Sequence, residues 1–241
     1  MALIYGHRGA SAYAPENTME AFRMALDMGA DGVELDVHLS KDGELVVLHD
    51  LELDRTTDGH GKVCDFTLEE LKKLDASNGM EAYRGARIPT LREVYALMQP
   101  AGAMVNIEIK STDSFYPGIE EKLLELEKEM GMTGRTVYSS FNHYTIAKLR
   151  QLDPDVQLGV LYMSGIYEPW NYAKQVGVQY IHPIFVNLMI PGLAEGCKAN
   201  GIGINAWTVD DPQMIGLCLS SGANVITNKP DLAVKLRDEQ R

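Results

Sequence analysis

The sequence predicts an α/β fold, a TIM-type (β/α)8 barrel with a small inserted subdomain after the second βα region. One junction recurs along the chain: a helical pattern ends at a glycine and a β-prone run begins within two residues, as in MGADGVEL at 28–35. About eight such runs can be placed, and most precede an amphipathic stretch. Strand-helix alternation of that count favours a closed parallel barrel over an open sheet.

The predicted strands and helices follow in order. Apolar, β-prone runs lie at 3–5, 33–37, 105–109, 136–138 and 158–161, and three more follow a glycine in VGVQYIHP, NGIGINAW and SGANVITN. A glycine just past a helix supplies the left-handed conformation that stops the helix, so the chain can enter the next strand. Amphipathic helices are expected at 118–130 and 142–152.

The alternation breaks after His49. Residues 51–90 do not continue the strand-helix rhythm, and a helical pattern resumes near Leu91. We interpret this stretch as an inserted subdomain within a single barrel domain that spans 1–241. Removing it leaves about 200 residues, the lower end of the size range of these barrels.

The chain is acidic, with 22 Lys and Arg against 34 Asp and Glu and a formal net charge of −12. A field of this sign repels polyanions, so no nucleic-acid partner is expected. No apolar stretch approaches the roughly 18 to 20 residues of a membrane span, and the N-terminus lacks an export signal, so no stable membrane insertion is expected. Three scattered cysteines argue against a disulfide framework or a structural zinc site, and we expect a cytoplasmic protein. Nothing in the composition indicates an oligomeric state.

Charged side chains gather where the β-runs end, which is where barrel active sites lie. The residues concerned are His7 and Arg8, Glu34 and Asp36, His49 and Asp50, and Glu108 and Lys110. Because side chains alternate along a strand, Glu34 and Asp36 point to the same side of their strand. Glu108 and Lys110 likewise point to the same side of theirs. The apolar residues of opposite parity are expected to pack outward against the helices, which directs the charged ones into the barrel.

Three inward carboxylates, Glu34, Asp36 and Glu108, would be costly to bury without neutralisation. An all-oxygen ligand set suits a hard divalent cation such as Mg²⁺ or Ca²⁺ better than zinc. The alternative is a structural ionic network in which Arg8 and Lys110 pair with these carboxylates.

His7 and His49 suit general acid-base catalysis, because imidazole titrates near neutral pH. Arg8 and Lys110 supply the local cations that an anionic substrate needs inside an acidic protein. Two aromatic residues near later strand ends, Phe141 and Trp207, are candidates for a wall that contacts an apolar part of the substrate.

Four further residues are interpreted mainly as structural or idle. Asn17 is expected to cap the first helix, with Glu20 completing a capping box. Glu16 has no charge partner in view. For His38 the alternatives are a contact with substrate at the rim and an exposed, idle imidazole, and we expect the second.

The motifs H-R-G at 7–9, P-E-N-T at 15–18, E-L-D-V at 34–37, K-D-G at 41–43, V-V-L-H-D at 46–50 and E-I-K at 108–110 resemble the glycerophosphodiester phosphodiesterases. The likeness continues through LDRTTDGHGKV, IPTLREV, 206–208 and 227–230, and so covers essentially the whole chain. It implies a catalytic pair of His7 and His49, a divalent metal on Glu34, Asp36 and Glu108, and phosphate held by Arg8 and Lys110.

The expected function is metal-dependent hydrolysis of glycerophosphodiesters, such as glycerophosphocholine and glycerophosphoethanolamine, to glycerol 3-phosphate and an alcohol. The expected partner is a small-molecule substrate. One alternative is a phospholipase C- or D-like activity on intact lipids, and another is a non-catalytic barrel that binds a phosphate ligand. The sequence leaves open the head group, the metal, the nucleophile (water or the glycerol hydroxyl), and which histidine is the acid.

Overall fold

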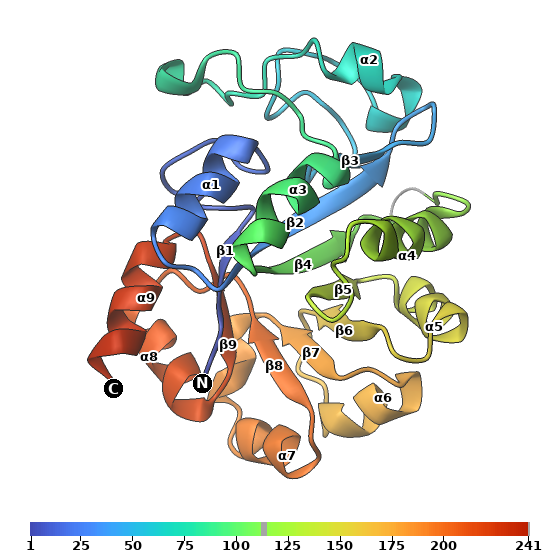
Figure 1. Cartoon of the computed structure of the whole chain (residues 1–241). Coiled ribbons are helices and arrows are strands. Elements are labelled where there is room, and N and C mark those ends of the chain that lie inside the picture. The colour runs from blue at the N-terminus through green and yellow to red at the C-terminus, as the bar shows by residue number, and fades with distance from the viewer. Residues whose placement is uncertain (112–114, 241) are drawn as a thin grey trace.

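Eight parallel strands close into a barrel in the computed structural model, which describes residues 1–111 and 115–240 (Figure 1). The strands pair in the order β1-β9-β8-β7-β6-β5-β4-β2, and pairing of β1 with β2 closes the ring. Their bounds are β1 Ile4–His7, β2 Gly32–Leu39, β4 Met104–Ile109, β5 Thr136–Ser140, β6 Gln157–Tyr162, β7 Tyr180–Pro183, β8 Gly203–Ala206 and β9 Asn224–Thr227. The predicted TIM-type barrel is therefore confirmed.

Helices follow the barrel strands and surround them (Figure 1). They are α1 Met19–Asp27, α3 Leu91–Ala101, α4 Ile119–Glu129, α5 His143–Leu152, α6 Pro169–Val176, α7 Leu193–Ala199, α8 Pro212–Ser221 and α9 Pro230–Glu239, and a 3-10 helix η3 Phe185–Met189 precedes α7. The helices expected at 118–130, at 142–152 and near Leu91 correspond to α4, α5 and α3. The glycine junctions act as predicted: Gly177 and Gly222 cap α6 and α8 with φ angles of 80° and 78°.

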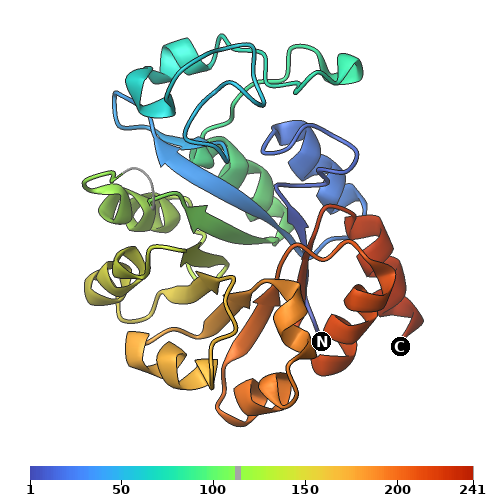
Figure 2. The same cartoon turned by 180° about the vertical axis from the view of Figure 1, so that it is seen from behind.

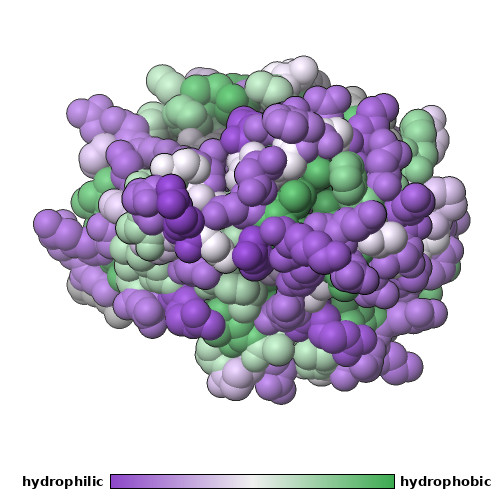
Figure 3. Space-filling model, turned by 90° about the horizontal axis from the view of Figure 1, so that it is seen from above, coloured by the Kyte–Doolittle hydropathy of each residue, from purple (hydrophilic) through white to green (hydrophobic). Residues whose placement is uncertain are grey.

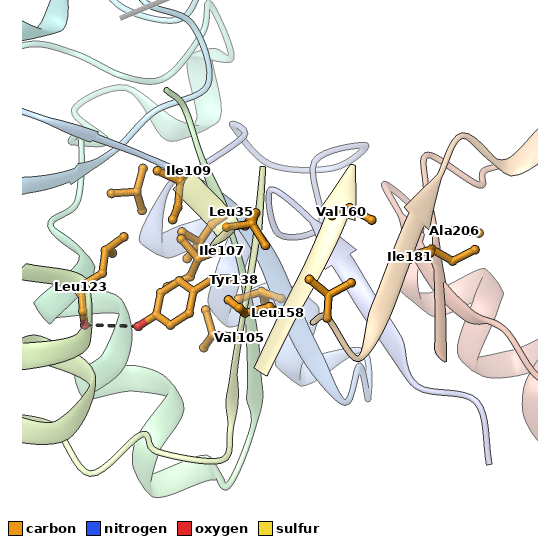
Figure 4. Close-up of a cluster of buried hydrophobic side chains, with 14 of the residues drawn as sticks. Leu35, Val105, Ile107, Ile109, Leu123, Tyr138, Leu158, Val160, Ile181 and Ala206 are labelled. Carbon is orange, nitrogen blue, oxygen red and sulfur yellow. Dashed lines mark hydrogen bonds between the residues drawn. The ribbon is translucent and has the colours of Figure 1, made fainter. Parts of the chain in front are cut away.

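The main core lies between the barrel wall and the helices. Apolar residues of neighbouring strands, such as Leu35, Val105 and Ile107, are fully buried and stack across the wall (Figure 4). Tyr138 extends from β5 toward α4, and its hydroxyl donates a hydrogen bond to the Leu123 carbonyl at 3.2 Å. Val33, Leu35 and Val37 thus pack on the side opposite the carboxylates of the same strand, as their parity predicts.

The strand β3 (Leu45–Val47) is antiparallel to β2 and does not belong to the barrel ring. Val37 pairs with Val47 and Leu39 with Leu45, so β2 and β3 form a hairpin. The returning chain reaches the level of the β2 carboxylates, where the Leu48 amide donates to the Asp36 carbonyl at 3.1 Å.

The segment after β3 builds a small hydrophobic core of its own. It contains the 3-10 helices η1 Val63–Asp65 and η2 Glu81–Tyr83 and the helix α2 Leu68–Leu71. Its buried residues, together with two from the β3 region, are Val46, Leu48, Leu53, Val63, Leu71, Ala76 and Ile88. The two ribbon views place this segment above the barrel strands, near α1 (Figure 2).

The surface seen from above is mostly hydrophilic, with hydrophobic residues in smaller groups (Figure 3). Within the described part of the chain, no helix combines the length and the apolar character needed to cross a membrane.

Candidate active site

The loop after β1 directs a backbone amide at the carboxylate cluster. Arg8 adopts a left-handed conformation with a φ of 53°. In this conformation its amide donates to Glu34 Oε2 at 3.0 Å, while its Nη1 donates to Glu16 Oε1 at 2.8 Å. Gly9 follows at a φ of 84°, where a Cβ would lie 2.6 Å from the Ala21 carbonyl carbon, so this tight turn onto α1 requires glycine.

Three carboxylates meet inside the barrel, as their parity predicted. The register of β2 and β4 sets Asp36 beside Glu108 and Glu34 beside Asn106. One oxygen from each of Glu34, Asp36 and Glu108 lies within 4.8 Å of the others, and all three side chains are largely buried. The spacing allows one ion to contact all three carboxylates.

The two cations of the predicted ionic network are present but do not complete it. Lys110 Nζ donates to Glu108 Oε1 at 2.7 Å and lies 3.6 Å from Asp36 Oδ1. Arg8 Nε lies 3.5 Å from Asp36 Oδ2. Asp36 Oδ1 is buried without a hydrogen-bond partner, which leaves a free acceptor facing the cluster.

The protonation preferences of the carboxylates reflect this crowding. Burial, and then the charges of Asp36 and Glu108, raise the pKa of Glu34 well above its usual range. The pKa of Glu108 is also raised, by burial and then by Asp36. Burial opposes ionisation of Asp36 as well, but Lys110 and Arg8 outweigh it and hold its pKa at about 2. Arg8 and Lys110 offset only part of the repulsion among the three carboxylates. A divalent cation would relieve the rest, so this set of oxygen ligands fits such an ion.

The tautomer of His7 is fixed by a chain of hydrogen bonds from later strands. Asn228 Nδ2 donates to Asp210 Oδ2 at 2.5 Å, which turns the amide oxygen of Asn228 toward His7 Nδ1 at 2.7 Å. Nδ1 must therefore be the donor, and Nε2 is left as the acceptor, 3.9 Å from Glu34 Oε2. Burial, and then the Arg8 charge, lower the pKa of His7 to about 4, so its neutral form dominates at pH 7.

His49 reaches the site from the β3 return rather than from a barrel strand. Its Nδ1 donates to Asp50 Oδ1 at 2.5 Å, and its Nε2 lies 3.2 Å from Lys110 Nζ. His38, on β2, lies 3.2 Å from the His49 carbonyl through Nε2 and 2.8 Å from the Tyr116 hydroxyl through Nδ1. The expectation that His38 is exposed is wrong: it is 2% exposed, because β3 folds back over β2.

The expected capping role of Asn17 is also wrong. Thr18 is the N-cap of α1, and its side chain accepts from the Ala21 amide. Asn17 has a φ of 58°, is buried, and donates from Nδ2 to Asp36 Oδ2 at 2.9 Å. The Asn17 side chain is therefore bonded to the carboxylate cluster, and the N-cap of α1 is the next residue, Thr18.

An aromatic wall lies beside the cluster. Trp207 lines a cavity together with His7, Glu34, Glu108 and His182. Its indole nitrogen donates to the His182 carbonyl at 2.8 Å, and Phe141 packs edge-on against it with ring centroids 5.6 Å apart. The structure therefore brings all nine predicted site residues to one end of the barrel, although contact of Phe141 and Trp207 with substrate stays a prediction.

Sequence reasoning missed three polar residues around the site, Arg55, Asp210 and Asn228, and also the charge partners of Glu16. Arg55 pairs with both Glu16 and Asp50, so Glu16 has the charge partners that the sequence did not reveal. The available signal was the family resemblance alone, because Glu16 lies in P-E-N-T, Arg55 in LDRTTDGHGKV and Asn228 in the segment at 227–230. Arg55 and Glu16 are 39 residues apart, and no periodicity connects them.

Comparison with known proteins agrees with this geometry. The model of the Glycerophosphoryl diester phosphodiesterase family matches residues 7–232. A glycerophosphodiester phosphodiesterase of Caldanaerobacter subterraneus subsp. tengcongensis is 47% identical over 236 residues, 97% of each chain. One from Bacillus altitudinis is 41% identical over 248 residues and covers 100% of each chain.

Solved structures share the fold. A glycerophosphodiester phosphodiesterase from Agrobacterium tumefaciens has a TM-score of 0.85 at 31% identity, covering 98% of this chain and 100% of its own. A phosphodiesterase from Oleispira antarctica, in complex with the product sn-glycerol-3-phosphate, has a TM-score of 0.86 at 29% identity. The match covers 98% of this chain and 96% of the Oleispira chain.

The fold and these relatives together define a barrel enzyme of the phosphoric diester hydrolase class. The chain belongs to the glycerophosphoryl diester phosphodiesterase family.

Proposed function

We propose that this enzyme hydrolyses glycerophosphodiesters, such as glycerophosphocholine and glycerophosphoethanolamine, to glycerol 3-phosphate and an alcohol. The observation that carries the proposal is the meeting of three buried carboxylates with two histidines and two cations inside one barrel. The product bound to the Oleispira antarctica relative supports the same product here.

Glu34, Asp36 and Glu108 would hold a divalent cation, Mg²⁺ or Ca²⁺. The free acceptor of Asp36 and the raised pKa values of Glu34 and Glu108 support this assignment. When bound, such an ion polarises a phosphoryl oxygen and stabilises the charge that develops on it.

Arg8 and Lys110 would bind the remaining phosphate oxygens. Glu16 and Asp36 hold the Arg8 guanidinium from two sides, and Lys110 is anchored on Glu108. These ion pairs orient the cations before substrate arrives, so less conformational freedom is lost on binding.

The surroundings of the two histidines differ. His7 is neutral with Nε2 free to accept, as a general base must be, whether the nucleophile is water or the glycerol hydroxyl. We therefore assign His7 as the base. This leaves His49, which is oriented by Asp50 through Nδ1 and has Nε2 3.2 Å from Lys110 Nζ, as the acid.

Release of glycerol 3-phosphate from both substrates by purified protein tests the proposal, first with EDTA and then with Mg²⁺ or Ca²⁺ restored. Metal-restored release is expected. His7→Ala and His49→Ala should each lower kcat by about 10²- to 10⁴-fold, as loss of a general acid or base does.

The matched control is His60→Ala, because His60 is exposed and bonds only to Asp54 among the described side chains. This variant should turn over like the wild type. Folded protein that releases no product with either metal would refute the proposed activity, and a histidine variant with wild-type kcat would remove that residue from the mechanism.

A further inference from the structure

The inserted segment places one arginine between the elements that carry the two histidines. Arg55 donates from Nε to Asp50 Oδ2 at 2.6 Å and from Nη2 to Asp50 Oδ1 at 3.0 Å. The same guanidinium donates from Nη1 and Nη2 to the two oxygens of Glu16, each at 2.8 Å. Two edges of one planar group therefore each hold a carboxylate by two hydrogen bonds.

One edge leads to His49. Asp50 accepts from His49 Nδ1 and from Arg55 at the same time, so the arginine limits how the carboxylate, and with it the imidazole, can turn. This restraint matters because His49 follows an antiparallel strand outside the barrel ring and lies in irregular backbone.

The other edge leads to Arg8. Glu16 accepts from Arg8 Nη1 as well as from Arg55, and Arg8 Nε lies beside Asp36. A continuous series of charged contacts therefore joins His49, Asp50, Arg55, Glu16 and Arg8.

We propose that Arg55 is a positioning residue that aligns His49 through Asp50 and Arg8 through Glu16, and so adjusts the acid and the phosphate-binding cation together. The inference rests on the proposed function, because it assumes those two roles. The side chain of Arg55 is 44% exposed, and exposed ion pairs contribute little to stability, so its effect should appear in site geometry rather than in folding. Lysine cannot replace it, because one ammonium lacks a planar fork for two carboxylates.

Kinetics of single and double variants test the proposal. Arg55→Ala should lower kcat by about 10- to 100-fold, as loss of an orienting partner does, and should also raise KM. Asp50→Asn should reproduce the kcat loss, and Glu16→Gln the rise in KM. Adding Arg55→Ala should then change kcat little in the Asp50→Asn background and KM little in the Glu16→Gln background.

Three further measurements separate positioning from a general structural effect. Arg84→Ala is the matched control, since Arg84 is an exposed arginine of the same segment that pairs with Glu81, and it should behave as wild type. Added guanidinium should restore part of the turnover of Arg55→Ala but not of Asp50→Asn. Arg55→Lys, which keeps the charge if the alanine variant fails to fold, should remain impaired.

An NMR readout that does not depend on activity distinguishes this inference from the proposed function. The His49 Nδ1 proton resonance should shift in Arg55→Ala and stay in place in Arg84→Ala, whether or not the wild type hydrolyses glycerophosphodiesters. The inference is overturned if this resonance does not move, if Arg55→Ala or Arg55→Lys keeps wild-type kcat and KM, or if the double variants lose the full product of the single losses.

Discussion

At the proposed metal site, protons would compete with the divalent cation for the same carboxylate oxygens. The pKa values of Glu34 and Glu108 are raised, so without metal these groups take up protons at a higher pH than ordinary glutamates. A protonated carboxyl is a poor ligand. Metal affinity should therefore fall as pH decreases, beginning above the usual carboxyl range, and binding at lower pH should release protons.

Isothermal titration calorimetry with Mg²⁺ or Ca²⁺ between about pH 5 and 8, in buffers of different ionisation enthalpy, measures both effects. Glu34→Gln should bind metal more weakly and release fewer protons. Affinity that is independent of pH, without proton release, would contradict the competition.

Individual residues were predicted from sequence where their environment is local, and missed where it is not. Alternation along β2 and β4 was sufficient to direct Glu34, Asp36 and Glu108 into the barrel. The position of Asn17 depends on a left-handed backbone and on a carboxylate from another strand, so local capping rules gave the wrong answer. The burial of His38 depends on a hairpin partner that its own pattern does not reveal.

At the scale of elements, helix α3 restarts the barrel after the inserted segment. Thr90 caps it with a complete capping box: its side chain accepts from the Glu93 amide, and the Glu93 side chain accepts from the Thr90 amide. Thr90→Ala should lower the free energy of unfolding by about 1 kcal/mol, which for a chain of this size lowers Tm by about 2–4 °C.

Thermal denaturation followed by circular dichroism measures this loss. Ser220→Ala is a suitable control, because Ser220 is an exposed helix residue whose hydroxyl bonds only to the Leu217 carbonyl among described groups. That change should stay within about 0.5 kcal/mol. Equal effects of the two substitutions would rule out a special contribution of the cap.

The elements themselves were mostly predictable, because a glycine caps α3, α6 and α8 and the strands contain apolar runs. The antiparallel direction of β3 was not predictable from sequence, since a three-residue apolar run carries no information on direction. His49 even so lies beside another predicted site residue, Lys110, because the hairpin returns to the level of Asp36.

At the scale of the whole molecule, the residues that the structure describes form two hydrophobic cores of unequal size. The smaller core has seven fully or largely buried residues, and most of them belong to the segment after β3. We propose that 51–90 behaves as a subdomain within one barrel domain, with a lower free energy of local opening than the barrel. Native-state hydrogen exchange in low urea should show its protected amides exchanging before those of β4 and β5.

Turnover measured in the same urea series should fall with the opening of this segment, before the barrel unfolds, because His49, Asp50 and Arg55 flank or belong to it. Coincident exchange and inactivation with global unfolding would show instead that the two cores are one cooperative unit.

The hairpin formed by β2 and β3 also has a consequence for exchange between relatives. The proposed ligand carboxylates and His7 belong to the barrel ring, whereas His49, Asp50 and Arg55 follow one another on the segment between β3 and α3. A chimera that receives this segment from another family member, joined at β3 and α3, would therefore take the donor's counterparts of His49, Asp50 and Arg55 together and keep the host's three carboxylates. Under the proposed roles, proton delivery and metal ligation would then diversify separately within a single barrel.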